Sequence, residues 1–146
     1  MRYMLKSDDV EALKREFIIT KEEEEERLKE ILKKIVKFVK VTEEGAIVFE
    51  IKNLAGIDRI GLALAARYVA GKLVENIRQE VSLDELSQIT GLQEKVASAR
   101  VKDLVNEGLV ERLGRGLYRA RGLFAVEKII EKVTEKYTLG DLESEE

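Results

Sequence analysis

Two predicted helices on either side of Gly91 are the feature that most restricts how this chain can fold. The segment "VSLDELSQIT" before Gly91 contains Ser82 and Glu85, which form a capping box, the Ser-x-x-Glu pattern that begins a helix. Gly91 favours the left-handed backbone conformation that ends a helix. Apolar residues then recur at helical spacing over 93–107, and Gly108 follows. The pattern predicts two helices joined by a tight glycine-containing turn, which is the helix-turn-helix arrangement.

The helix predicted for 93–107 has an apolar and a polar side. At about 100° per residue, one side carries the apolar residues Ala97, Val101, Leu104 and Val105. The opposite side carries Lys95, Ala99, Lys102 and Asn106, with Val96 and Asp103 at one edge. Arg100 lies nearer the apolar side, where its stem can cover apolar surface while its guanidinium reaches solvent. We expect the apolar side to be buried and the other side to be available for contacts.

A β-hairpin is predicted directly after this helix. The runs "LVERL" and "LYRA" are typical of short strands, and the "GRG" between them permits a tight reversal. The hairpin segment gathers four arginines, Arg112, Arg115, Arg119 and Arg121. Residues 92–124 hold seven basic and four acidic residues, a local charge of +3, although the whole chain has a charge of −3 and the remainder therefore −6.

Residues 58–77, "DRIGLALAARYVAGKLVENI", predict another helix before the pair. Asp58 stands at its start, where a carboxylate interacts favourably with the helix dipole. Its large apolar side chains are mixed with many Gly and Ala residues, which let a neighbouring backbone approach closely. We therefore expect this helix to be buried at the centre of the fold.

Helix, helix, helix and hairpin, in this order, resembles the winged helix-turn-helix DNA-binding domains of prokaryotic, archaeal-like transcription regulators. The resemblance rests on "LDELSQITGL", "KVASARVKDLVNEGLVER" and "GRGLYRA", and it covers residues 58–120, a little under half of the chain. It implies a recognition helix at 93–107 that enters the major groove and a wing at 112–119 that contacts the DNA backbone or minor groove. The candidate DNA-binding residues are Lys95, Ala99, Arg100, Lys102, Arg112, Arg115, Arg119 and Arg121.

The segment before residue 58 predicts helices at 7–16 and 21–36, and Thr20 with Glu23 forms a capping box for the second. A switch to period two then predicts a β-hairpin over 36–51. After the winged helix, "GLFAVEKIIEKVTEKY" predicts an amphipathic helix. Its apolar side carries Phe124, Ile129, Ile130 and Val133, with Leu123 and Val126 adjoining.

Together these elements predict an α+β fold that is mainly α. We divide the chain into an N-terminal helical and β-hairpin extension (1–57), a winged helix-turn-helix domain (58–121), a C-terminal helix (122–137) and an acidic tail (138–146). We expect a homodimer, with the C-terminal helix as the favoured contact and the helix at 21–36 as a competing one.

The residues that are missing exclude several functional classes. The chain has no His, Cys or Trp, so the common zinc sites and the usual catalytic triads cannot be built. It has no glycine-rich phosphate loop, no dinucleotide-binding motif and no calcium loop. The composition still permits a Mg²⁺ or Ca²⁺ site built from carboxylates alone. We expect no enzymatic activity, no cofactor and no metal. A signal peptide and an apolar membrane span are also not apparent, which predicts a cytoplasmic protein, and the Glu- and Lys-rich composition resembles that of hyperthermophiles.

The sequence thus predicts a transcription regulator that binds double-stranded DNA. Ala99 and Asp103 on the recognition helix suggest that the wing contributes more of the affinity than the helix does. The alternative is a winged helix that serves as a protein-interaction or assembly module without DNA readout. The wing arginines also have a simpler interpretation, a solvated hairpin with surface ion pairs to Glu107 and Glu111. No effector pocket can be located from the sequence.

Overall fold

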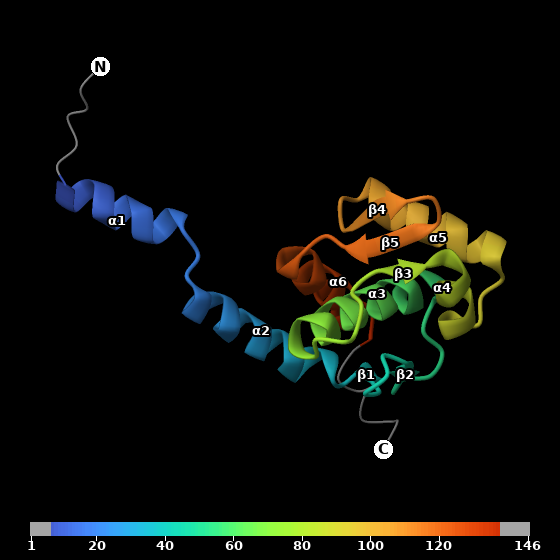
Figure 1. Ribbon diagram of the computed structural model, residues 1–146. Helices are drawn as coiled ribbons and strands as arrows, with labels where there is room; N and C mark the ends of the chain where they lie inside the picture. The colour runs from blue at the N-terminus through green and yellow to red at the C-terminus, as the bar shows by residue number, and fades with distance from the viewer. Residues whose placement is uncertain (1–6, 138–146) are drawn as a thin grey trace.

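The predicted α+β fold, mainly helical, is confirmed by a computed structural model, which describes residues 7–137 (Figure 1). Its helices are α1 (Ser7–Phe17), α2 (Lys21–Ile35), α3 (Gly56–Leu73), α4 (Leu83–Thr90), α5 (Glu94–Asn106) and α6 (Leu123–Lys136). Its strands are β1 (Val39–Val41), β2 (Ile47–Phe49), β3 (Val81–Ser82), β4 (Val110–Gly114) and β5 (Leu117–Ala120). The acidic tail predicted for 138–146 lies outside the described residues.

Helix α3 lies at the centre, as its composition predicts. It packs against α4, α5 and α6, and also against β1 and β5. Its large residues Ile60, Leu62 and Leu64 are completely buried. Gly61 brings α6 close, because a Cβ at this position would lie 3.2 Å from Cγ2 of Ile129. The small residues of α3 therefore permit close packing on several sides at once.

The end of α3 differs from the prediction. The sequence predicts a helix through residue 77, whereas α3 ends at Leu73. The chain then turns back across Gly71, where a Cβ would lie 2.5 Å from Cγ of Gln79 and 3.0 Å from the Ile77 carbonyl oxygen. This close crossing stops the helix although the sequence "VENI" is compatible with continuing it.

A small antiparallel sheet contains one strand that the sequence does not reveal. Strand β5 lies in the middle and pairs with β4 on one side and with the two-residue β3 on the other. The hairpin predicted around "GRG" is confirmed, with Gly116 in the left-handed region at φ +67°. The Leu83 N–H donates to the Gly116 carbonyl oxygen at 2.9 Å. The tip of the hairpin is thereby joined to the first residue of α4.

The segment before α3 contributes to the same hydrophobic core. The Glu23 N–H donates to Thr20 Oγ1 at 3.1 Å, so the predicted cap of α2 is formed. The predicted hairpin is also present, with Val39 paired to Phe49. Ile31, Ile35 and Phe38 belong to the core cluster that includes residues of α3 and α6. In contrast, α1 extends away from the body (Figure 1), and the described side chains of α1 from Asp9 onward are exposed.

Helix α6 packs on its own chain, against α2 and α3. Ile129, Ile130 and Val133 are buried there, as is Val126. Phe124 does not join this buried side as predicted. Its side chain is 59% exposed, and the Arg27 guanidinium lies 4.1 Å from the ring centroid. The apolar side of α6, which we favoured as a dimer contact, is thus occupied within the chain.

Candidate nucleic-acid interface

The turn between α4 and α5 is fixed by local hydrogen bonds. Gly91 adopts φ +74°, and its N–H donates to the Ser87 carbonyl oxygen at 2.9 Å. Ser87 Oγ donates to the Leu92 carbonyl oxygen at 2.6 Å, and Thr90 Oγ1 donates to the Leu86 carbonyl oxygen at 2.7 Å. The two helices predicted on either side of Gly91 are therefore present, with a tight turn between them.

Helix α5 has the two sides that the sequence predicts. Ala97, Val101 and Leu104 are buried, and Val105 is half-buried. Lys95, Ala99, Lys102 and Asn106 are exposed. The exposed side also includes Val96, whose side chain is 42% exposed.

Arg100 is the candidate on α5 whose charge is already engaged. It is half-buried, and its Nε lies 3.4 Å from Oδ2 of Asp103, one turn further along the helix. This ion pair is partly exposed and therefore weak, but it offsets the positive charge at this position. Of the basic side chains on α5, Lys95 and Lys102 are the two with no ion pair to another described residue.

The four hairpin arginines fall into two groups. Arg119 donates from Nε and Nη2 to Oε2 of Glu111, at 3.3 and 3.2 Å. The two residues are paired in register across β4 and β5, so their side chains lie on the same face of the hairpin. Arg112, Arg115 and Arg121 are exposed and form no ion pair with any residue that the structure describes.

Glu107, the other acid considered as a partner for the wing, contacts Lys132 of α6 instead. This pairing joins the end of α5 to α6. Of the two ion pairs that the sequence suggested for the wing, the structure therefore contains only the one to Glu111 within its described residues. Three arginines of the hairpin remain available for an external anion.

Helix α5 and the hairpin are held against each other. Strand β4 packs on α5, and the Leu109 N–H donates to the Leu104 carbonyl oxygen at 3.1 Å across the turn at Gly108. At the other end, the bond from Leu83 to Gly116 fixes the hairpin tip to α4. The sequence missed this second attachment because β3 has only two residues, too few to show a period of two. Leu113 on β4 is 40% exposed, and no pattern in the sequence marks it as an exposed apolar residue.

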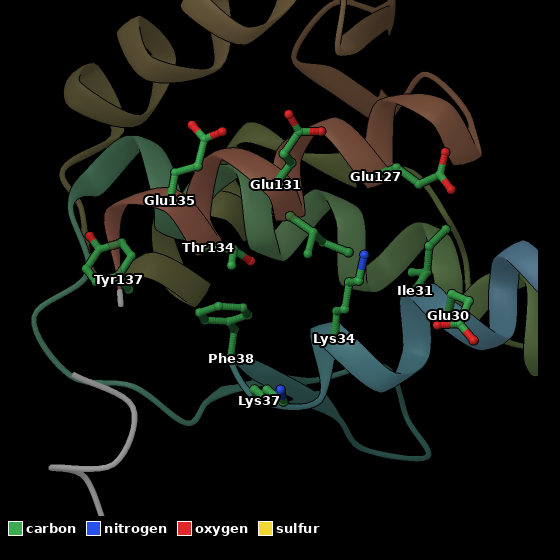
Figure 2. A pocket seen from close by; sticks show the side chains of 11 residues that line it. Glu30, Ile31, Lys34, Lys37, Phe38, Glu127, Glu131, Thr134, Glu135 and Tyr137 are labelled. Carbon is green, nitrogen blue, oxygen red and sulfur yellow. The ribbon is translucent and has the colours of Figure 1, made fainter. Parts of the chain in front are cut away.

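A separate cavity of about 570 Å³ lies between α2 and α6. Figure 2 shows Lys34, Phe38 and Thr134 between the two helices, whereas the Glu131 and Glu135 carboxylates point away from Phe38 in this view. Because the walls carry both signs of charge, they define no single class of ligand.

At one end of this cavity, the Tyr137 hydroxyl accepts from the Ala55 N–H at 2.8 Å and donates to Asp58 Oδ2 at 3.0 Å. Burial, and the adjacent Asp58 carboxylate, raise the pKa of Tyr137 above its usual value. Lys136 Nζ also donates to both carboxylate oxygens of Asp58, at 3.1 and 3.3 Å. These contacts join the end of α6 to the start of α3.

Within residues 7–137, no group of three or more acidic side chains is arranged to hold a metal ion. No helix in the same part of the chain has the length and apolar character needed to cross a membrane. No protein-family model, curated protein or solved structure matches the chain.

Proposed function

We propose that residues 58–121 form a winged helix-turn-helix domain that binds double-stranded DNA and acts in transcription regulation. The order of the elements supports this assignment. Helix α3 is followed by α4 and α5 around a tight turn, and then by the β4–β5 hairpin. In this arrangement α5 is the recognition helix and the hairpin is the wing.

The observation that carries the proposal is the set of unpaired cations on these two elements. Arg112, Arg115 and Arg121 of the hairpin, with Lys95 and Lys102 of α5, have no acidic partner among the described residues. An acidic chain has many carboxylates available to neutralise such groups. These five cations lie on two elements that pack against each other. Such a surface suits phosphate oxygens, since each contact with DNA releases condensed counterions and adds affinity.

The proposal assigns different tasks to the wing and the helix. Ala99 lies on the exposed side of α5 and has no polar group to bind a base, although it suits contact with a thymine methyl group. Lys102 is long enough to reach a base edge or a phosphate. Most of the affinity is therefore assigned to the wing arginines, and base discrimination to a few contacts from α5.

Salt-dependent DNA binding tests this proposal. The affinity of the full chain for a labelled duplex is measured by fluorescence anisotropy over a series of salt concentrations. The variant Arg112→Gln/Arg115→Gln is expected to bind less tightly, with a slope of log K against log salt that is shallower by about 0.9 for each phosphate that the wing no longer neutralises. The control Lys52→Gln/Lys128→Gln removes two exposed charges that lie outside α5 and the hairpin, and it leaves the wing intact.

Two results would contradict the proposal. A flat slope for the unmodified chain excludes phosphate contacts as the source of affinity. If the wing variant and the Lys52→Gln/Lys128→Gln control lose the same affinity, net charge alone accounts for binding, and the wing has no special part in it.

One observation favours the alternative of a protein-interaction module. Val96 on α5 and Leu113 on β4, the strand that also carries Arg112, are exposed apolar residues. A stoichiometric partner protein that survives nuclease treatment and is released by Leu113→Asp supports this second function. If the Leu113→Asp variant still binds that partner, the surface formed by the wing is not the binding site.

A further inference from the structure

Helix α1 presents an apolar face that is not buried against the rest of the described chain. Val10, Leu13 and Phe17 recur at steps of three and four residues, so they lie on one face of the helix. Their side chains are 46%, 53% and 84% exposed. Figure 1 shows α1 projecting from the body at the far end of α2. This spacing is typical of a helix that binds in an apolar groove.

A groove of suitable character lies on the body of the same molecule. It has a volume of about 380 Å³ and is formed by the second half of α2, by β1, and by the end of α3 with the turn after it. Ile35 and Val69 belong to its walls, and the more exposed Val36, Leu73 and Val74 surround them. The chain thus carries both a projecting apolar helix and an open apolar groove.

Charge indicates which copy of the chain fills the groove. Residues 8–26 contain nine acidic and three basic residues, a net charge of −6. Residues 27–40, which run along α2 into β1, contain six basic and one acidic residue, a net charge of +5. Arg27, Lys33 and Lys40 are paired with Glu127, Glu30 and Glu50, and the other three bases have no ion pair to a described residue. Two copies arranged antiparallel would place the acidic segment of each beside the basic segment of the other.

Docking of α1 in the groove of its own chain would not bring opposite charges together in this way. The connection from α1 to α2 spans only Ile18–Thr20, and Thr20 caps α2. Folding back would bring Glu16 beside the glutamates at 22–26, so like charges would meet at the hinge.

From these features we propose that the protein forms a two-fold dimer in which α1 of each copy docks in the groove of the other. Val10, Leu13 and Phe17 supply the apolar contacts, and Val36, Leu73 and Val74 receive them. The exchange is reciprocal, so each dimer contains two identical contacts. It uses neither α5 nor the wing, and it therefore stands whether or not the protein binds DNA.

Sedimentation equilibrium of the full chain over a concentration series tests the proposal. Leu13→Asp removes the α1 side of the contact, and Leu73→Glu removes the groove side. Each is expected to weaken dimerisation by about tenfold or more, because a charge is placed in an apolar interface. The matched control is Leu113→Asp, an exposed leucine on the hairpin, which is expected to dimerise like the unmodified chain. Circular dichroism checks that each variant is folded.

A mixing experiment distinguishes the reciprocal docking of α1 from other modes of association. Dimers of Leu13→Asp alone, or of Leu73→Glu alone, retain neither contact. A mixed dimer retains one, because α1 of the groove variant can still dock in the groove of the α1 variant. The equimolar mixture is therefore expected to dimerise more tightly than either variant alone.

Three results would overturn the proposal. The unmodified chain could remain monomeric throughout the series, either single variant could dimerise like the unmodified chain, or the mixture could associate no better than its components. DNA binding measured on the same samples remains informative in each case, since the wing is unchanged in both variants.

Discussion

Arg67 on α3 and Glu85 on α4 form an ion pair in which the arginine is buried and the glutamate is partly exposed. The Arg67 Nη2 lies 2.5 Å from Glu85 Oε2, and the two side chains are 7% and 40% exposed. The Glu85 N–H also donates to Ser82 Oγ at 3.0 Å. Glu85 thus connects the start of the helix pair to the central helix, because its carboxylate neutralises a guanidinium that has little access to water.

Loss of Glu85 is expected to destabilise the protein. Glu85→Ala leaves the Arg67 charge buried without its partner, which we expect to lower the free energy of unfolding by about 2 kcal/mol, less than for a fully buried pair since Glu85 reaches solvent. Urea denaturation measures the change. The neighbouring exposed Asp84 provides the control, and Asp84→Ala is expected to change the stability by about 0.5 kcal/mol or less. Equal effects of the two variants would contradict a special role for the pair.

Tyr137 predicts a loss of stability in alkaline solution. Burial and the nearby Asp58 carboxylate raise its pKa in the folded protein above the ordinary value of 10.0. The folded state therefore holds the phenolic proton more tightly than the unfolded state. This contribution to stability is complete below pH 10 and is lost as the pH rises through the folded pKa.

The titration is followed by ultraviolet absorbance of the phenolate. In the folded chain, one of the four tyrosines is expected to ionise later than in the urea-unfolded chain. Tyr137→Phe should remove this late step and flatten the decline in stability above pH 10. A late step that persists in the variant would assign it to another tyrosine.

Glu111 is expected to limit the affinity for DNA. Its carboxylate holds Arg119 at 3.2 Å, and Glu111→Gln would free that charge for a phosphate. We expect affinity to rise several-fold and the salt slope to steepen by about 0.9 if one more phosphate is neutralised. Glu127→Gln is the control, because it releases Arg27, on the α2 side of the molecule. An equal gain in both variants would indicate a general effect of net charge.

A side chain at Gly71 is expected to destabilise the folded protein. A Cβ there would lie 2.5 Å from Cγ of Gln79 and 3.0 Å from a backbone oxygen of Ile77, so the returning chain must shift. Gly71→Ala should lower the free energy of unfolding by about 1–3 kcal/mol, as overpacking commonly does. At Gly114 a Cβ would meet nothing within 4 Å, and Gly114→Ala should have little effect by thermal denaturation. Similar melting temperatures for the two variants would contradict the close crossing.

Much of the fold could be predicted because its signals are local. The caps at Thr20 and Ser82 and the left-handed Gly91 each act within a few residues of their own position. The errors arose where distant parts of the chain decide the outcome. The end of α3 depends on the chain that returns over Gly71. Phe124 contacts Arg27, almost a hundred residues away, and does not join the buried side of α6.

The candidate interface could be predicted less completely. The exposed side of α5 follows from helical periodicity, so Lys95 and Lys102 were placed correctly on it. Whether each arginine is available to bind an anion depends on whether a carboxylate of the folded chain lies within ion-pair distance of it. The sequence offered Glu107 and Glu111 as partners for the wing, and the structure uses Glu111 for Arg119 while Glu107 contacts Lys132. Contact with DNA itself depends on a molecule outside the chain, so it stays a prediction.

The burial of α3 on every side means that hydrogen exchange of its amides can measure the global stability of the protein. From Ile60 to Arg67 each residue of this helix is buried. No partial opening can therefore bring its amide protons to water without separating the helix from its neighbours. In deuterium exchange, these amides would exchange at the rate set by complete unfolding, whereas those of the exposed α1 would exchange much earlier. The slowest protons of α3 would thus report the global free energy of unfolding directly, without denaturant.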